Sequence, residues 1–287
     1  MKAFTLARAA ALALAAAGAQ AAEPLAKTLF GAAKTGSAQM PSPMGSYAKG
    51  CLAGGLRMPE DGPGWQFVRL SRNRNWGHPE AFSFLTRLAA AGQAAGGNSL
   101  LVGDVSQPRG GPMTTGHASH QIGLDLDIWF NDGPAAPMSR AARESAGAVS
   151  MVAADKRRVT AAFGPLQRAL LRASAEDGAV ARIFVNAAIK AELCRTEPEP
   201  RPWLRKLRPW WGHDAHFHVR LACPAGAELC RDQDPPATGD GCDASLDWWF
   251  SDEALNPPPP KTPPVRARDV MTLADLPAEC RGVLDAD

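Results

Sequence analysis

The sequence lacks any long hydrophobic run after its first 21 residues. Those residues begin with Lys2 and Arg8, continue through the apolar letters LALAAA and end in an A-x-A site at positions 19–21. This order is typical of a secretory signal peptide, and the apolar part is too short to span a bilayer as an anchor. We therefore predict cleavage after Ala21, export, and no membrane span in residues 22–287.

The exported chain also lacks a surplus of charge of one sign. Without Lys2 and Arg8, the 31 Lys and Arg residues fall to the same number as the 29 Asp and Glu residues. Proteins that bind phosphate backbones rely on an excess of Lys and Arg, so the balance argues against nucleic acid as a partner. A single domain over residues 22–287, ending in a proline-rich tail, is the simplest organisation.

No C-x-x-C pair occurs among the cysteines. An even number of them, in a chain that we expect to be exported, favours three disulfides over a zinc-thiolate site. Oxidised thiols also argue against a cysteine nucleophile. Spacing alone leaves the pairing open among Cys51, Cys194, Cys223, Cys230, Cys242 and Cys280.

Histidine is scarce outside two short runs. The runs are GHASHQIGLDLDIWF at residues 116–130 and WWGHDAHFHVRL at residues 210–221, and only His78 lies elsewhere. The absence of H-E-x-x-H excludes a thermolysin-type site. Imidazoles and carboxylates are the groups that zinc and acid–base chemistry use. The runs supply His117, His120, Asp125, Asp127, His213, His216 and His218.

Both runs contain alternating segments that predict strands with one apolar and one polar face. Strands are also predicted at residues 65–70, 100–105 and 181–185. Helices are predicted from Pro79 to about residue 91, at 139–172 with a break near Gly164, and at 187–193, whereas residues 22–58 resemble an extended arm. The fold class that follows is α+β, in which an antiparallel sheet presents the site and helices and disulfide-tied loops flank it.

Three of these side chains form a predicted zinc ligand set. A catalytic zinc usually has three protein ligands and one open position. Asp127 and His218 stand on the polar faces of their strands. His120 would lie on the wrong face of one straight strand, but Gly123 offers a turn that brings it round. The ligand set is therefore His120, Asp127 and His218.

The remaining polar groups receive supporting roles. His216 lies on the same face as His218 and can take a proton as general base from a zinc-bound water, while His213 can hold an oxyanion or steer the water. Asp125 can orient a ligand imidazole. A structural zinc site with His213 or His216 as fourth ligand is the alternative. Asp104 is interpreted as a cap or turn acid, and each of Arg109 and Arg220 as either a substrate-carboxylate contact or an ion pair.

At this point the sequence resembles a known family. SHQIGLDLDIW and HDAHFHVRLACP resemble the penicillin-insensitive murein endopeptidases, part of a zinc peptidase group that includes lysostaphin-type enzymes, D-Ala-D-Ala peptidases and the hedgehog domain. The likeness extends to GSYAKGCLAGG, LSRNRNWGHPE, VGDVSQPRGGPMTTGHASH and RIFVNAAIK. It covers most of residues 45–250.

The resemblance implies a periplasmic hydrolase of D-alanyl–meso-diaminopimelate cross-links in peptidoglycan. It implies zinc on His120, Asp127 and His218, with His216 as base and His213 beside it. A D,D-carboxypeptidase with the same site and a non-catalytic zinc module that binds wall peptides are the alternatives.

The resemblance also implies a disulfide pairing and bears on a second metal. The pairs would be Cys51–Cys280, Cys194–Cys242 and Cys223–Cys230. Some relatives carry a second metal on residues that match His117 and Asp155, but Arg158 stands at the position of the third ligand. Because a cation there repels a metal, we expect one zinc, with His117 as a hydrogen-bonding neighbour.

Overall fold

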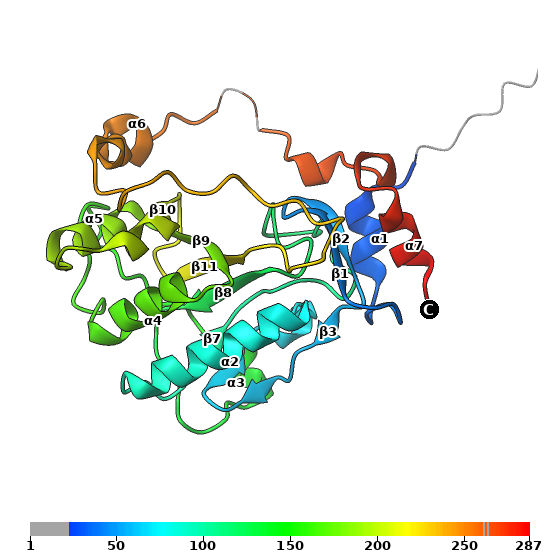
Figure 1. The fold of residues 1–287 in the computed structure, drawn as a ribbon, viewed down its shortest axis with the longest axis horizontal. Helices are drawn as coiled ribbons and strands as arrows, with labels where there is room; N and C mark the ends of the chain where they lie inside the picture. Colours follow the sequence, from blue (N-terminus) through cyan, green and yellow to red (C-terminus); the bar gives the residue numbers. More distant parts are fainter. Residues whose placement is uncertain (1–22, 261, 263) are drawn as a thin grey trace, which may run out of the picture.

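A seven-stranded sheet forms the centre of the protein in the computed structural model, which describes residues 23–260, 262 and 264–287 (Figure 1). The strand order is β10-β9-β11-β8-β7-β5-β4. The three strands that carry the site, β9, β11 and β8, pair antiparallel, whereas the β10–β9 and β5–β7 pairs are parallel. The strands are β4 (Asp61–Gly62), β5 (Trp65–Phe67), β7 (Leu100–Val102), β8 (Asp125–Trp129), β9 (Val180–Val185), β10 (Leu207–Pro209) and β11 (His216–Leu221).

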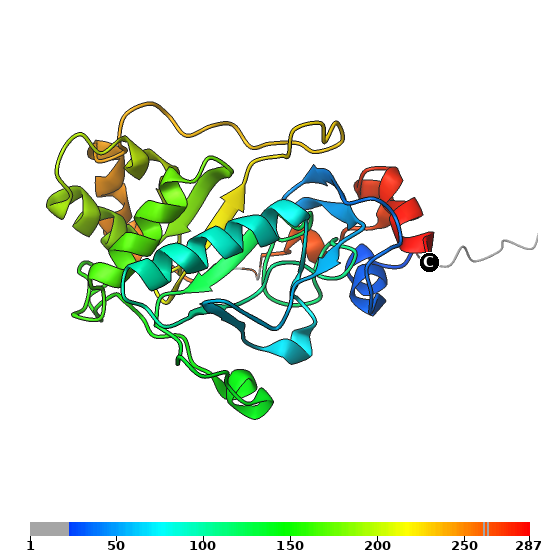
Figure 2. The same cartoon turned by 60° about the horizontal axis from the view of Figure 1, so that its bottom comes forward.

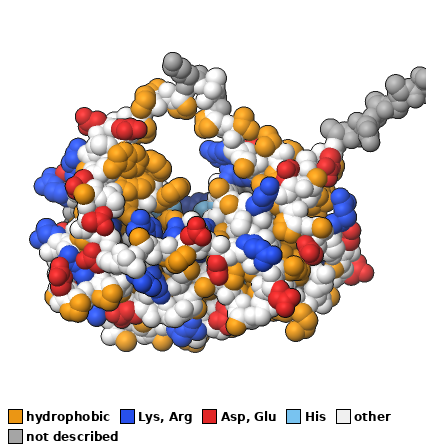
Figure 3. Space-filling view, turned by 45° about the horizontal axis from the view of Figure 1, so that its top comes forward, with side chains coloured by type: hydrophobic (Ala, Val, Ile, Leu, Met, Phe, Trp, Pro, Cys, Tyr) orange, Lys and Arg blue, Asp and Glu red, His pale blue; other side chains and the backbone are white. Residues whose placement is uncertain are grey.

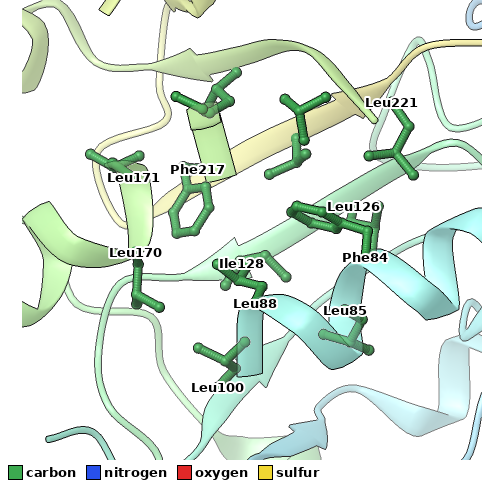
Figure 4. Packing of buried hydrophobic residues seen from close by; sticks show 14 of the residues in the cluster. Phe84, Leu85, Leu88, Leu100, Leu126, Ile128, Leu170, Leu171, Phe217 and Leu221 are labelled. Atoms are coloured by element: carbon green, nitrogen blue, oxygen red, sulfur yellow. The ribbon is translucent and has the colours of Figure 1, made fainter. Parts of the chain in front are cut away.

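Two helices, α2 (Pro79–Ala94) and α4 (Pro165–Glu176), cover one face of this sheet (Figures 1 and 2). Pro79 suits the first turn of α2, and the His78 side chain caps the helix by accepting from the Glu80 amide. Apolar side chains recur every three or four residues along α2, so one stripe is buried. Figure 4 shows this stripe and α4 packed on Leu126, Ile128, Phe217 and Leu221 of the central strands.

No helix of the described residues covers the opposite face of the central strands, and this face carries the polar side chains. Alternation along β8 and β11 places one set of side chains in the core and the other on the open face. The sequence predicted both strands and both faces, and the structure confirms the α+β class with a site on antiparallel strands.

The N- and C-terminal segments of the described chain pack together at one end of the sheet (Figures 1 and 2). Helix α1 (Ala26–Ala32), the hairpin of β1 (Ser42–Ser46) and β2 (Lys49–Ala53), and helix α7 (Glu279–Asp285) share a small apolar cluster. The Cys51–Cys280 disulfide crosses it. The prediction of an extended arm over residues 22–58 was wrong, because this second cluster buries a helix and a hairpin.

At the other end lie α5 (Ala187–Thr196) and α6 (Asp252–Leu255), and the Cys194–Cys242 disulfide joins α5 to the segment that leads to α6. The Cys223–Cys230 disulfide closes a short loop after β11, next to β1. Outside the main sheet, β3 (Leu56–Arg57) pairs with β6 (Trp76–Gly77). The helical prediction for residues 139–172 was too long. Only α3 (Arg140–Ser145) and α4 are α-helices, and the segment between them is irregular.

Within the described residues, no helix is both long enough and apolar enough to cross a membrane. The predicted signal peptide at residues 1–21 lies outside the described residues.

One buried cation in α5 gives the fold a pH dependence. The Lys190 side chain is fully buried and donates to the carbonyls of Leu204 at 2.6 Å and Asp240 at 2.5 Å. Burial, with the nearby charges of Arg208 and Arg201, lowers the pKa of Lys190 from 10.5 to about 7. Between these two values the unfolded chain binds a proton that the folded protein does not, so stability rises with pH across this window.

We predict that Lys190→Met removes this component. The free energy of unfolding of the wild type, measured by urea titration, should rise relative to that of the variant between about pH 7 and about pH 9, by at most about 1.4 kcal/mol per pH unit. Lys190→Met also leaves two carbonyls without their donor, which lowers the free energy of unfolding by the same amount at every pH. Comparing the pH dependence of the two proteins removes this constant difference. Parallel pH profiles for the two proteins would contradict the prediction.

Candidate active site

The site begins with the register between β8 and β11. Asp127 lies directly opposite His218, and Asp125 lies opposite Arg220. Paired residues on antiparallel strands point to the same side of a sheet, so all four side chains share the open face. Only one residue of these four, Arg220, is positively charged at all pH values of interest.

His120 reaches this face through a loop with left-handed backbone conformations. Gly123 has φ of 72°, as the predicted turn requires, and His120 itself has φ of 65°. The His120 amide donates to Asp125 Oδ2 at 2.9 Å, which fixes the loop to β8. The His120 Nδ1 lies 2.7 Å from the carbonyl of Val105. Because a carbonyl can only accept, Nδ1 carries the proton and Nε2 presents a free lone pair.

The Asp127 carboxylate is the common neighbour of the surrounding imidazoles. Its Oδ1 lies 3.4 Å from His120 Nε2, 3.3 Å from His218 Nδ1 and 3.8 Å from His216 Nε2. Its Oδ2 lies 3.4 Å from His117 Nε2. Burial raises the pKa of Asp127, but the neighbouring imidazoles outweigh this and hold it well below its usual range.

His218 also contacts the second strand acid. Its Nε2 lies 3.0 Å from Asp125 Oδ1, and Arg220 donates to the same carboxylate at 2.9 Å and 3.3 Å. Burial lowers the pKa of His218, but the effect of Asp125 and Asp127 is larger and raises the pKa to about 9. The Arg220 guanidinium stacks over the Tyr47 ring, with its carbon 4.2 Å from the ring centre. Arg220 is therefore a buried ion-pair partner, one of the two roles that the sequence left open.

Asp104 holds His117, a role that sequence reasoning missed. The Asp104 side chain is 3 % exposed and lies 3.0 Å from His117 Nε2, 2.7 Å from Arg74 and 3.1 Å from Arg72. Burial raises its pKa, but His117 and Arg74 lower it to about 2. The interpretation as a cap or turn acid was wrong. In the sequence, Asp104 follows β7 and precedes the first histidine run by about a dozen residues. Only the folded structure shows that its carboxylate contacts His117.

His213 and His216 lie at the rim of the same group. Their ring centres are 4.9 Å apart, and His213 Nδ1 lies 2.9 Å from the carbonyl of Trp211. Burial and the neighbouring His218 and His216 lower the pKa of His213 to about 4. His213 is therefore neutral near pH 7, with its proton on Nδ1 and only an accepting lone pair on Nε2.

Two further candidates lie elsewhere. Asp155 is outside the cluster and instead accepts from Arg158 at 2.8 Å and from the Arg157 amide. Arg109 donates to the backbone carbonyls of Val283 and Leu284 and so joins the chain ends. Neither arrangement offers a group to the histidine cluster.

A cavity of about 510 Å³ opens above this cluster. Figure 3 looks into the hollow, with histidine side chains at its floor. The lining includes His117, His213, His218, Phe184, Trp210 and Trp211. A substrate in this cavity would therefore meet imidazoles at the floor and aromatic rings on the wall.

The cluster has the donors that a metal ion requires. His117, His120 and Asp127 each offer one ligand atom, all within 4.8 Å of one another. The buried atoms His120 Nε2 and Asp127 Oδ1 have no hydrogen-bond partner among the described residues. Buried polar atoms are normally paired, and imidazole nitrogen with carboxylate oxygen is a suitable donor set for zinc. The residues therefore fit a bound metal ion.

The chain is similar to proteins of one known family. Residues 43–285 match the family described as penicillin-insensitive murein endopeptidase. A penicillin-insensitive murein endopeptidase of Haemophilus influenzae is 43% identical over 77% of this chain and 76% of its own length. Proteins of the same name from Klebsiella pneumoniae subsp. pneumoniae and Yersinia enterocolitica are 42% and 41% identical, over 87% and 85% of this chain and 87% and 86% of their own lengths.

The buried carboxylate of Asp104 generates a stability prediction. Asp104→Ala leaves the Arg74 guanidinium, itself 8 % exposed, without its charged partner. Loss of one partner of a buried ion pair costs about 3–5 kcal/mol, so urea unfolding should show a loss of this size. Asp155→Ala, which breaks an exposed pair, is the matched control and should leave the free energy of unfolding nearly unchanged. Equal effects of the two substitutions would refute the structural role of Asp104.

Proposed function

The chain belongs to the penicillin-insensitive murein endopeptidase family, a family of peptidases, and on this premise we propose that it hydrolyses D-alanyl–meso-diaminopimelate cross-links in peptidoglycan with the help of zinc. The observation that carries the proposal is the pair of unpartnered buried atoms, His120 Nε2 and Asp127 Oδ1, beneath a cavity lined by further imidazoles. The peptide cross-links of the wall are its proposed partner.

We assign the metal to His120 Nε2, Asp127 Oδ1 and His218 Nδ1. The carbonyl of Val105 lies 2.7 Å from His120 Nδ1, and Asp125 Oδ1 lies 3.0 Å from His218 Nε2. The other nitrogen of each ring faces Asp127 Oδ1. When bound, zinc polarises the scissile carbonyl and makes water a stronger acid. His117 remains a neighbour of the site, held by Asp104, and one zinc suffices.

His216 is the proposed general base. Its Nε2 lies 3.8 Å from Asp127 Oδ1, and its side chain is 29% exposed, so it is close to the cluster and still open to solvent. It takes the proton of the attacking water and returns it to the leaving amine. His213 presents an accepting nitrogen beside it, which suits orientation of the water. A neutral ring whose proton is used by Trp211 cannot donate to an oxyanion, so water orientation is the role that we retain for His213.

The proposed location is the periplasm. A murein substrate lies outside the cytoplasm, and three disulfides form in oxidising compartments.

The different roles proposed for His216 (general base) and His218 (metal ligand) can be tested by substitution. We predict that His216→Ala keeps the metal but loses hydrolysis by about 100-fold or more, because general-base catalysis contributes about 10²–10⁴-fold. His218→Ala should lose both. Metal content is measured by mass spectrometry of the purified variants and hydrolysis with muropeptide dimers. A His216→Ala protein that cleaves at the wild-type rate would remove His216 as the base.

Product analysis tests the reaction itself. Muropeptide dimers with D-alanyl–diaminopimelate links, incubated with the protein, should be converted to monomers. A chelator should stop this conversion and added zinc should restore it. Mass spectrometry separates the outcomes, since loss of a terminal D-alanine from intact dimers would show a carboxypeptidase instead. Conversion that continues unchanged with the chelator would contradict the metal requirement.

A further inference from the structure

The open face of the sheet carries two more arginines beyond the histidine cluster. In β9, Phe184 lies opposite His218 and Arg182 lies opposite Arg220. In β10, Arg208 lies opposite Phe184. Paired residues share a face, so these side chains extend the row that begins with His218. All of them line the cavity above the cluster.

Unlike Arg220, these two arginines have no carboxylate as a direct partner in the described residues. Arg220 is paired with Asp125. Arg182 donates to the backbone carbonyl of Asp234 at 2.7 Å, and within the described part of the chain neither Arg182 nor Arg208 forms an ion pair with a carboxylate. Burial and the positive charges of Arg208 and Arg220 lower the pKa of Arg182. A guanidinium stays protonated at neutral pH, and no carboxylate of the described residues lines the cavity, so this wall carries positive charge.

We propose that Arg182 and Arg208 bind a free carboxylate of the cross-link peptide, on the amine side of the bond that is cut. This inference rests on the proposed function. Two half-buried guanidiniums in one cavity are suited to a carboxylate, which accepts paired, charge-assisted hydrogen bonds from arginine.

The position of the two arginines fits the chemistry of the substrate. Neighbouring strands lie about 4.8 Å apart, which places Arg208 two strands, about 10 Å, from His218. In the proposed cross-link, the carbon attached to the scissile nitrogen also bears a free carboxylate, and a short alkyl chain continues from it. Phe184 lies between His218 and Arg208, with its ring centre 5.2 Å from that of His218, and offers an apolar surface to this chain.

The test compares two dimers that differ only at this carboxylate, one free and one amidated. We expect the wild type to prefer the free form by about 10- to 100-fold in kcat/KM, as loss of a charged hydrogen-bonded pair implies. Arg182→Gln and Arg208→Gln should each lose most of this preference, chiefly through a higher KM for the free form. Arg205→Gln removes a charge from the exposed turn at Pro202–Lys206 and should keep the preference.

A binding measurement separates this inference from the proposed function. The diaminopimelate tripeptide, free or amidated at the same carboxylate, is added in increasing amounts to the protein. Binding is followed by the change in fluorescence of the tryptophans that line the cavity. Tighter binding of the free form by the wild type, lost in Arg182→Gln and Arg208→Gln, supports the subsite even if dimers are not cleaved. Equal cleavage and equal binding of the two forms by the wild type, or equal losses on both forms in the variants, would overturn it.

Discussion

The buried negative charge of Asp127 is the constraint on which the rest of the site depends. An ionised carboxylate in a protein interior costs several kcal/mol unless it is paired. Here four imidazoles approach it within 3.8 Å. His216 and His218 come from β11, far from β8 in sequence, and His117 and His120 come from the loop before the turn at Gly123. The side chain thus requires either protonated histidines or a metal ion beside it. The free lone pair of His120 favours the metal.

A second layer of charges keeps this arrangement in place. Asp125 and Asp104 flank Asp127 on either side, and each is neutralised by an arginine on its outer side, Arg220 and Arg74 respectively. Each also faces a histidine on its inner side. The two acids therefore act as fixed acceptors that orient imidazoles, while their arginines prevent the excess of negative charge that would otherwise oppose burial.

The sequence predicted those parts of the site that depend on local pattern. Alternation along β8 and β11 placed Asp127, His216 and His218 on one face, and Gly123 indicated the turn that brings His120 to it. Contacts between distant segments were beyond such reasoning. Asp104 meets His117 only because β7 lies beside β8, and Arg182 and Arg208 join the cavity only through the register of β9 and β10. For the same reason the small cluster of α1, β1, β2 and α7 was missed, since its apolar residues come from both ends of the chain.

The C-terminal segment is part of the site and not a trailing appendage. Arg268, almost fully buried, donates to the backbone carbonyls of Gly116 and His117 and so supports the loop that bears the first histidine run. Twelve residues later, Cys280 is bonded to Cys51 in the hairpin of β1 and β2. The scaffold of the cleft is therefore complete only when Arg268 and Cys280 have reached the loop and the hairpin, which in the proposed location happens after export. Assembly of the active centre in this way depends on contacts between residues that are 152 and 229 positions apart in the sequence.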